Sequence, residues 1–149
     1  MSREIFITNT QTGKKEKLET LEPGKLKFYS CGPTVYNFIH IGNLRAAMTS
    51  DLFYRWFKRA GYDVTYVRNY TDVDDRIIAQ AIKESVPTEE ITKKYIAEVE
   101  KDYALAGLLE PTHKTTVTGH MKEIIVMIEA IIKNGKGYTV KDPATGGDE

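Results

Sequence analysis

The side chains best suited to chemistry lie in one stretch, residues 31–45, which reads CGPTVYNFIHIGNLR. The second half of this stretch holds His40, Gly42 and Asn43 close together. Imidazole and amide N–H groups donate hydrogen bonds to phosphate oxygens as charge builds on them, and a glycine lets a nucleotide approach the backbone closely. The pattern predicts phosphate binding, although a His-Ile-Gly-Asn tetrapeptide also occurs by chance in loops whose histidine is structural.

The stretch begins with Cys31, the single cysteine of the chain. A thiolate is a soft ligand that suits Zn²⁺, but zinc needs four ligands, or three and an open position. The histidines besides His40 are His113 and His120, and neither lies at a tight Cys/His spacing. A buried cysteine that serves as a small apolar residue is therefore the alternative. One cysteine forms no internal disulfide, so we expect a reducing, cytoplasmic setting.

A second candidate cluster is acidic and consists of Asp72, Asp74 and Asp75. Closely spaced aspartates bind Mg²⁺ or Ca²⁺ in some proteins. Here no glycine occupies the turn position and no glutamate follows at loop spacing, which excludes an EF-hand loop. Aspartates in a first helical turn also stabilise the helix. We therefore interpret Asp74 and Asp75 as residues that cap a helix and order a loop.

A strand–helix–strand unit must position the stretch 31–45. Residues 26–31 predict a buried strand that stops at a Gly-Pro pair, because proline donates no hydrogen bond to a strand ladder. Apolar residues recur every four positions from Leu44 to Trp56 and predict a helix over 42–60. The β-branched and aromatic residues at 63–68 predict a second strand. Such a unit has parallel strands and a right-handed crossover.

The predicted unit brings the ends of its two strands to one edge of a sheet. In open α/β sheets, ligands bind at the carboxyl ends of the strands, and a helix N-terminus offers free N–H groups to phosphate. We therefore expect Cys31 to face the same crevice as His40 and Thr71, with its thiol partly accessible.

Short strands precede this unit and helices follow it. Segments 4–9 and 15–19 predict a hairpin, and helical patterns follow at 74–84, 88–105 and 116–134. The last residues are polar and rich in glycine, which is typical of a loop or a frayed end. Two or three strands are few for an open α/β sheet, so the chain has the pattern of the first section of a larger fold.

Composition excludes several classes of protein. The chain has 149 residues, 41% of them hydrophobic, which is enough for one domain with a core. Its 21 basic and 21 acidic residues give a net charge of zero, so charge alone favours neither nucleic acid nor a membrane surface. The first residues lack the apolar region of a secretory signal, and no apolar run approaches the roughly 18 residues of a membrane helix.

Two blocks of the sequence resemble signatures of the cysteinyl-tRNA synthetases, a family of class I aminoacyl-tRNA synthetases. Residues 31–45 resemble the family's C-G-P-T-V-Y segment and its H-I-G-H or H-I-G-N element. Residues 69–78 are similar to its N-x-T-D-V-D-D-K-I-I block. The resemblance continues to Gly137-Tyr138, so it covers nearly the whole chain.

The resemblance implies an α/β fold, the N-terminal portion of a Rossmann-like class I synthetase catalytic domain, with a parallel βαβ unit followed by helices. The expected parts are a hairpin and turn (1–24), the βαβ nucleotide-binding unit (25–85), a helical segment (86–137) and a loop or frayed end (138–149).

The same resemblance implies a cysteine-tRNA ligase. Such an enzyme uses ATP with Mg²⁺ to convert L-cysteine to cysteinyl-adenylate and passes the cysteinyl group to tRNA(Cys). We expect a cytoplasmic monomer that binds no membrane. The implied roles are these: His40 and Asn43 catalytic; His40, Gly42 and Asn43 ATP-binding; Gly32, Thr34, Asn69 and Thr71 substrate-binding; and Cys31 a ligand of a zinc ion that also binds the substrate thiolate.

Two features depart from the family pattern. Thr118-Gly119-His120-Met121 replaces a T-E-H-I run and so lacks its carboxylate. No K-M-S-K-S-like loop and no anticodon-binding helical domain occur within the 149 residues. We therefore expect the chain to hold only the first half of an active site and to have little adenylation activity alone. The alternatives are a cysteine ligase of thiol biosynthesis, a non-catalytic nucleotide- or cysteine-binding module, and a structural or interaction fragment.

Overall fold

The protein is described by a computed structural model that covers residues 4–141. The chain divides into two compact units, one ending at Val117 and the other beginning at Thr118. Residues 142–149 of the predicted C-terminal loop, and residues 1–3 of the predicted hairpin segment, lie outside the described part. The elements of the first unit are β1 (Phe6–Asn9), β2 (Lys14–Lys17), β3 (Lys25–Ser30), α1 (Ile41–Arg59), β4 (Asp63–Tyr70), α2 (Asp75–Glu84), α3 (Thr88–Leu105) and β5 (His113–Thr116).

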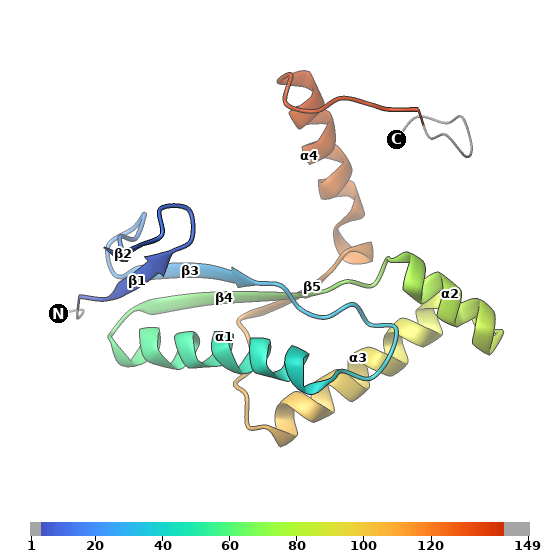
Figure 1. Cartoon of the computed structure of the whole chain (residues 1–149), viewed down its shortest axis with the longest axis horizontal. Coiled ribbons are helices and arrows are strands. Elements are labelled where there is room, and N and C mark those ends of the chain that lie inside the picture. Colours follow the sequence, from blue (N-terminus) through green and yellow to red (C-terminus); the bar gives the residue numbers. More distant parts are fainter. Residues whose placement is uncertain (1–3, 142–149) are drawn as a thin grey trace. The chain divides into compact units, whose positions relative to one another are not determined.

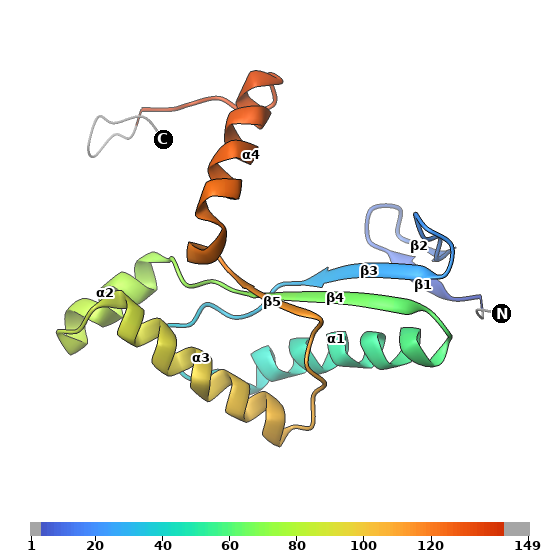
Figure 2. The same cartoon turned by 180° about the vertical axis from the view of Figure 1, so that it is seen from behind.

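A parallel sheet of order β3-β4-β5 forms the centre of the first unit. In β3 and β4, Leu26 pairs with Val64 and Ser30 with Arg68. Helix α1 connects these two strands, so the predicted parallel βαβ unit is confirmed. Helices α1 and α3 lie on the same side of the strands, below them in Figure 1 and again in the reverse view of Figure 2.

The alternation of side chains along β4 explains which face of the sheet is covered. Tyr66, Arg68 and Tyr70 occupy every second position and are buried, as the two-residue period of a strand requires. The ring of Tyr66 stacks on Phe28 of β3, with 4.5 Å between centroids. Aromatic pairs of this kind stabilise a core beyond the area that they bury.

The predicted hairpin is also confirmed, because β1 and β2 pair antiparallel with Phe6 opposite Lys17. A small apolar cluster attaches the hairpin to the sheet and to α1. Its buried members are Ile5, Leu26, Phe57 and Ala60. A second cluster joins the loop after β3 to the first turns of α1 and to the helices α2 and α3. Its buried members are Val35, Ala47, Tyr70, Ile77, Ala81, Ile91, Tyr95, Val99 and Tyr103.

The helix expected at 42–60 is present, but its buried face is not the four-residue stripe that predicts it. Ala47, Tyr54 and Phe57 are the residues of α1 that are buried. Leu52 and Trp56 from the stripe are 65% and 51% exposed. The stripe predicts the right periodicity and the wrong face, because α1 places Ala47 and Phe57 in the two clusters and Tyr54 against the aromatic rings of the sheet.

The prediction of a helical segment from 86 to 137 is wrong at β5. This strand pairs parallel with β4, with Val67 opposite His113 and Tyr70 opposite Thr116. The helix expected to begin at residue 116 therefore begins later, at Met121. In the second unit, a short 3₁₀ turn, η1 (Thr118–His120), precedes α4 (Met121–Lys133).

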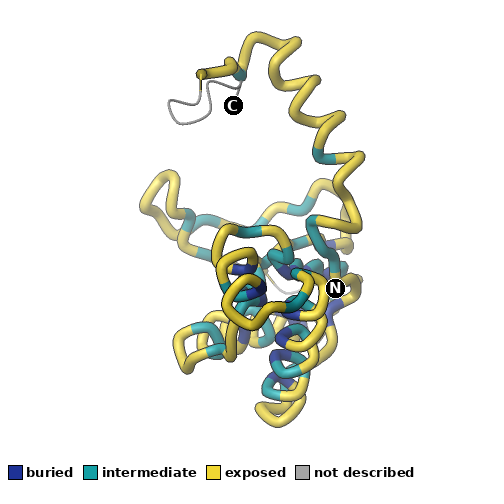
Figure 3. The backbone as a smooth tube through the Cα atoms, turned by 90° about the vertical axis from the view of Figure 1, so that its right-hand side faces the viewer, coloured by how far each residue is buried: buried dark blue, intermediate teal, exposed yellow. Residues whose placement is uncertain are grey.

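Helix α4 is rich in isoleucine and yet has no buried residue. Figure 3 colours it as exposed along most of its length. Its exposed apolar residues are Met121, Ile125, Val126, Met127, Ile128, Ile131 and Ile132. No helix among the described residues combines the length and the apolar character that a membrane crossing requires.

A polar network joins helix α3 to strands β4 and β5 of the sheet. The guanidinium of Arg68 is buried and lies 4.4 Å from the centre of the Tyr103 ring and 4.0 Å from the Glu100 carboxylate. Glu100 also accepts hydrogen bonds from the Tyr70 hydroxyl and from Lys114, the latter at 2.7 Å. Burial alone raises the pKa of Glu100, but the hydrogen bonds from Lys114 and Tyr70 outweigh burial and leave that pKa below its usual value.

Because of this lowered pKa, we expect Glu100 to make the stability of the fold depend on acid pH. Its contribution is complete above the unfolded carboxyl pKa of about 4.3 and is lost as the pH falls through the lower pKa of the folded state. Glu100→Gln should lower the free energy of unfolding by about 1–2 kcal/mol at pH 7, since Glu100 is only partly buried, and should cost less at pH 3.

Urea unfolding of the 149-residue chain at pH 7 and pH 3 measures this difference. The matched control is Glu98→Gln on the same helix, because Glu98 pairs with Lys101 at the surface and its loss should cost about 0.5 kcal/mol or less. An equal cost for the two variants at both pH values contradicts the assignment.

Candidate active site

The carboxyl end of β3 carries the single thiol of the chain. Cys31 directly follows the last residue of the strand and is exposed. The hydroxyl of Tyr29, two positions earlier, lies close to the thiol. Burial, and after it the charge of the Cys31 thiolate, raises the pKa of Tyr29. The accessible thiol expected at the end of the first parallel strand is thus observed, and the alternative of a buried apolar cysteine does not hold.

Gly32 makes the tightest contact between the two strand ends. Its N–H donates to the side-chain oxygen of Asn69 at 2.8 Å, and the Asn69 amide lies 3.5 Å from the Thr71 hydroxyl. A Cβ at position 32 would lie 1.7 Å from the backbone oxygen of Asn69. Only glycine therefore fits at position 32, because the obstacle is backbone and cannot rotate away.

The loop after Gly32 continues this pairing with the segment after β4. Thr34 forms an isolated parallel bridge with Thr71, and the N–H of Val35 donates to the Thr71 carbonyl at 3.2 Å. The Val35 side chain is completely buried. These contacts hold Gly32, Thr34, Asn69 and Thr71 together, and we call these four residues the strand-end group.

His40, Gly42 and Asn43 form a second group at the start of α1, which we call the helix-start group. His40 is the N-cap residue, and its Nδ1 atom accepts the N–H of Gly42 at 3.0 Å. In return, the side-chain oxygen of Asn43 accepts the backbone N–H of His40 at 3.2 Å. The two side chains complete a reciprocal capping box, with histidine and asparagine in place of the usual Ser/Thr and Glu/Gln.

This capping arrangement fixes how the imidazole can act. Because Nδ1 of a neutral His40 accepts a hydrogen bond, the ring proton resides on Nε2. The Nε2–H group of the exposed His40 and the amide nitrogen of Asn43 remain as donors. A Cβ at Gly42 would lie 2.8 Å from the His40 ring, so the glycine also leaves room for the imidazole. Donors at a helix N-terminus suit phosphate oxygens.

The two groups are each joined internally, and within residues 4–141 no hydrogen bond links one to the other. A hollow of about 420 Å³ beside His40 is lined by Ile39, Ile41, Leu44, two α3 residues and the C-cap residue of α3, and neither Cys31 nor Thr71 lines it. One crevice shared by Cys31, His40 and Thr71 therefore stays a prediction.

The described residues do not form a metal site on their own. No three His, Cys, Asp or Glu side chains within residues 4–141 are grouped so that they would hold a metal ion. Cys31 supplies one thiol, and zinc needs at least three protein ligands. The zinc assignment of Cys31 thus depends on ligands outside the described part.

Within the acidic cluster, Asp74 has the capping role that the sequence predicts. Asp74 is the N-cap of α2 and accepts the N–H of Arg76 at 2.9 Å, while Asp75 lies in the first turn. Asp72 accepts the N–H of Val117 at 2.7 Å, which ties the segment after β4 to the segment after β5.

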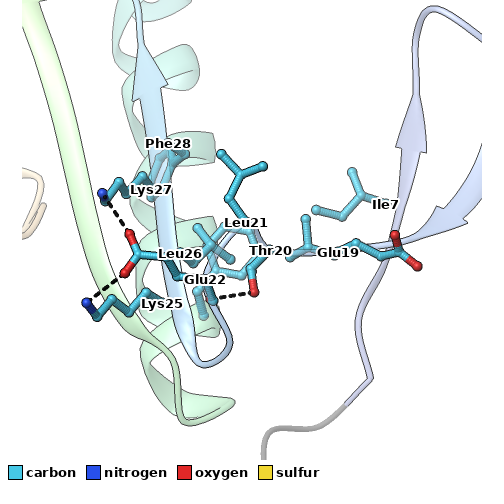
Figure 4. Close-up of a pocket in the computed structure, with 11 residues that line it drawn as sticks. Ile7, Glu19, Thr20, Leu21, Glu22, Lys25, Leu26, Lys27 and Phe28 are labelled. Carbon is cyan, nitrogen blue, oxygen red and sulfur yellow. Dashed lines mark hydrogen bonds and ion pairs between the residues drawn. The ribbon is translucent and has the colours of Figure 1, made fainter.

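Another hollow, of about 250 Å³, lies at the opposite, N-terminal end of β3 (Figure 4). Apolar side chains such as Ile7 and Leu26 line it, and three of its charged residues are paired, because Lys25 and Lys27 both contact Glu22, at 2.8 and 3.3 Å. It contains no predicted site residue. We interpret it as the seam between the hairpin and the sheet.

Sequence reasoning did not single out Arg76, whose guanidinium contacts the strand-end group through Thr34. The resemblance already carried a signal, since the family block has lysine where this chain has Arg76. Lysine carries a compact ammonium group, whereas arginine carries a planar guanidinium with several donors in fixed directions, so the two side chains bind different sets of partners.

The sequence of the chain is similar to those of known proteins. Residues 17–148 match the family described as "tRNA synthetases class I (C) catalytic domain". A protein of Geobacter sulfurreducens named "Cysteine--tRNA ligase" is 49% identical over 134 residues, which is 90% of this chain and 28% of that protein. Proteins of the same name are 45% identical in Chromobacterium violaceum, over 97% of this chain and 31% of theirs, and in Thermosipho africanus, over 93% and 29%. The chain thus spans less than a third of the length of these relatives.

Proposed function

The chain belongs to the class I tRNA synthetase family, and from this membership we propose that the full-length protein in which it occurs is a cysteine-tRNA ligase. The observation that carries the proposal is the 45–49% identity to proteins named "Cysteine--tRNA ligase", which extends over 90–97% of the chain. Both the strand-end group and the helix-start group lie inside the matched residues.

In the proposed first step, a carboxylate oxygen of L-cysteine attacks the α-phosphorus of ATP, which is bound with Mg²⁺. The bond to the β-phosphate bridging oxygen breaks, and pyrophosphate leaves with that electron pair. We assign the helix-start group to ATP: the Nε2–H of His40 and the amide of Asn43 donate to phosphate oxygens, and Gly42 permits close approach. Donors fixed in advance by the capping box need no reorganisation when charge develops on the phosphate.

We assign the strand-end group to the amino acid and its adenylate. The Thr71 hydroxyl lies beside the Asn69 amide, Thr34 is bridged to Thr71, and Cys31 directly precedes Gly32 in the chain. Cys31 is proposed as one ligand of a zinc ion whose other ligands lie outside the described residues. A thiolate at this place suits zinc, and zinc in turn prefers a thiol substrate over a hydroxyl.

In the proposed second step, a terminal ribose hydroxyl of tRNA(Cys) attacks the cysteinyl carbonyl, and AMP leaves. We propose a monomeric, cytoplasmic enzyme for this reaction. The name of the relatives, "Cysteine--tRNA ligase", supports tRNA as the acceptor. A cysteine ligase of thiol biosynthesis would use the same adenylation step, so an aminosugar is the alternative acceptor.

The experiment that tests this proposal gives the purified full-length protein cysteine and ATP with either tRNA(Cys) transcripts or an aminosugar. We expect radiolabelled cysteine to become attached to the tRNA and not to the sugar. Transfer to the sugar alone assigns the protein to thiol biosynthesis. Nucleotide and cysteine binding without turnover identifies a binding module instead.

A further inference from the structure

Arg76 connects the start of α2 to the strand-end group. Its Nε atom donates to Oδ1 of Asp74 at 2.8 Å and its Nη2 atom to Oδ2 at 3.0 Å. The same Nη2 atom lies 3.2 Å from the hydroxyl oxygen of Thr34, as its donor. The guanidinium also lies over the ring of Tyr36, 5.1 Å from its centre. One side chain thus contacts Thr34 and Tyr36, the neighbours on both sides of the buried Val35.

Both sides of this contact are held by other parts of the fold. Asp74 is the N-cap of α2, and its hydrogen bonds from Arg76 lower its pKa to about 2, so it stays ionised at neutral pH. The backbone of Thr34 is fixed by its bridge to Thr71. The Thr34 side chain can still rotate about its own bond. Among the described residues, its hydroxyl oxygen accepts a hydrogen bond from Arg76.

A hydroxyl that accepts one hydrogen bond keeps its own proton for another partner. An O–H group has one donor and two acceptor positions. Because Arg76 has only donors, the Thr34 oxygen must accept from it, and the Thr34 proton points elsewhere. A lysine at position 76 would offer a compact charge on a flexible stem, whereas the planar guanidinium holds the carboxylate and the hydroxyl in one fixed geometry.

We propose that Arg76 is a positioning residue that sets the Thr34 hydroxyl as a hydrogen-bond donor toward the amino-acid substrate. The inference rests on the proposed function, in which Thr34 binds that substrate. Arg76 itself touches no reacting atom in this assignment. Arg76 affects the binding of the amino acid. It does not affect the binding of the ATP phosphates, which the helix-start group contacts in the proposed function.

The test is a double-mutant cycle in the full-length protein, read by ATP–pyrophosphate exchange at varied cysteine and varied ATP. Arg76→Met and Thr34→Val should each raise the KM for cysteine about tenfold, the worth of one oriented hydrogen bond. The KM for ATP should stay within twofold. The double variant should be no worse than Thr34→Val, because Arg76 has nothing left to position.

Three further variants separate positioning from a general loss of structure. Arg76→Lys should recover part of the cysteine affinity, because lysine keeps a cationic hydrogen-bond donor. Thr34→Ser should keep most of the affinity, because serine keeps the hydroxyl. Lys83→Met is the matched control, because it removes a cation from the last turn of the same helix and should change neither KM. Thermal unfolding of every variant checks that it is folded.

The outcomes separate this inference from the function on which it rests. Active variants whose cysteine KM is unchanged, or single effects that multiply in the double variant, overturn the positioning role and leave the ligase intact. A parallel rise in the KM for ATP also overturns it, because it indicates a disturbed site as a whole. A wild-type protein without cysteine-dependent exchange overturns both.

Discussion

Gly32→Ala should lower cysteine-dependent ATP–pyrophosphate exchange about 10²-fold and destabilise the fold by about 3 kcal/mol. The added methyl group would lie 1.7 Å from the backbone oxygen and 2.9 Å from the carbonyl carbon of Asn69. Neither atom moves without shifting β4 or the loop after β3. A displacement of about 1 Å at a reacting centre costs roughly 10²-fold in rate. Thermal unfolding and exchange assays on the same preparation measure the two effects.

Asn69→Ala is the matched control for this prediction. It removes the oxygen that accepts the Gly32 N–H at 2.8 Å and introduces no clash. Its cost should therefore be about 1 kcal/mol, the net worth of one hydrogen bond. If Gly32→Ala is as stable and as active as the wild type, the close approach of the two strand ends is incorrect.

Replacing His40 should lower kcat for cysteine activation about 10²–10³-fold, because one donor to the developing phosphate charge is lost. His40 has two functions in this structure, as the N-cap of α1 and as the bearer of an outward Nε2–H group. His40→Asn keeps a side-chain oxygen for the cap and removes the imidazole. His40→Ala removes both functions.

The two variants should agree in rate and differ in stability. His40→Ala should lose about 1 kcal/mol of folding free energy, the usual worth of an N-cap, whereas His40→Asn should lose little. Single-turnover adenylate formation and thermal unfolding give the two quantities. An active His40→Asn variant contradicts a catalytic role and leaves His40 as a helix cap alone.

The sequence allowed the central βαβ unit to be predicted because its signals are strong and agree with one another. The Gly-Pro stop after 26–31 and the β-branched and aromatic residues of 63–68 indicate strands, and the four-residue recurrence from Leu44 to Trp56 indicates a helix. The structure confirms all three elements. Pairing between parallel strands then places Cys31 beside the segment that contains Asn69 and Thr71, without any knowledge of side-chain contacts.

What could not be predicted depends on contacts between distant residues. The four polar residues of β5, His-Lys-Thr-Thr, show no alternation of apolar side chains and become a strand through pairing with β4. Arg68 would normally be placed at the surface, yet α3 supplies Tyr103 and Glu100 to bury it. The capping box of His40 and Asn43 lacks the usual residue types, so the sequence located both residues without showing that they bind each other.

Amino-acid-dependent ATP–pyrophosphate exchange by the purified full-length protein tests the proposed function most directly. The assay compares cysteine, serine and no amino acid at equal concentrations, with ATP and Mg²⁺ present. We expect exchange with cysteine that exceeds exchange with serine by at least about 10²-fold, since binding differences at small side chains reach that order. Exchange with serine or another amino acid and none with cysteine would contradict the assignment of this chain to a cysteine-activating enzyme.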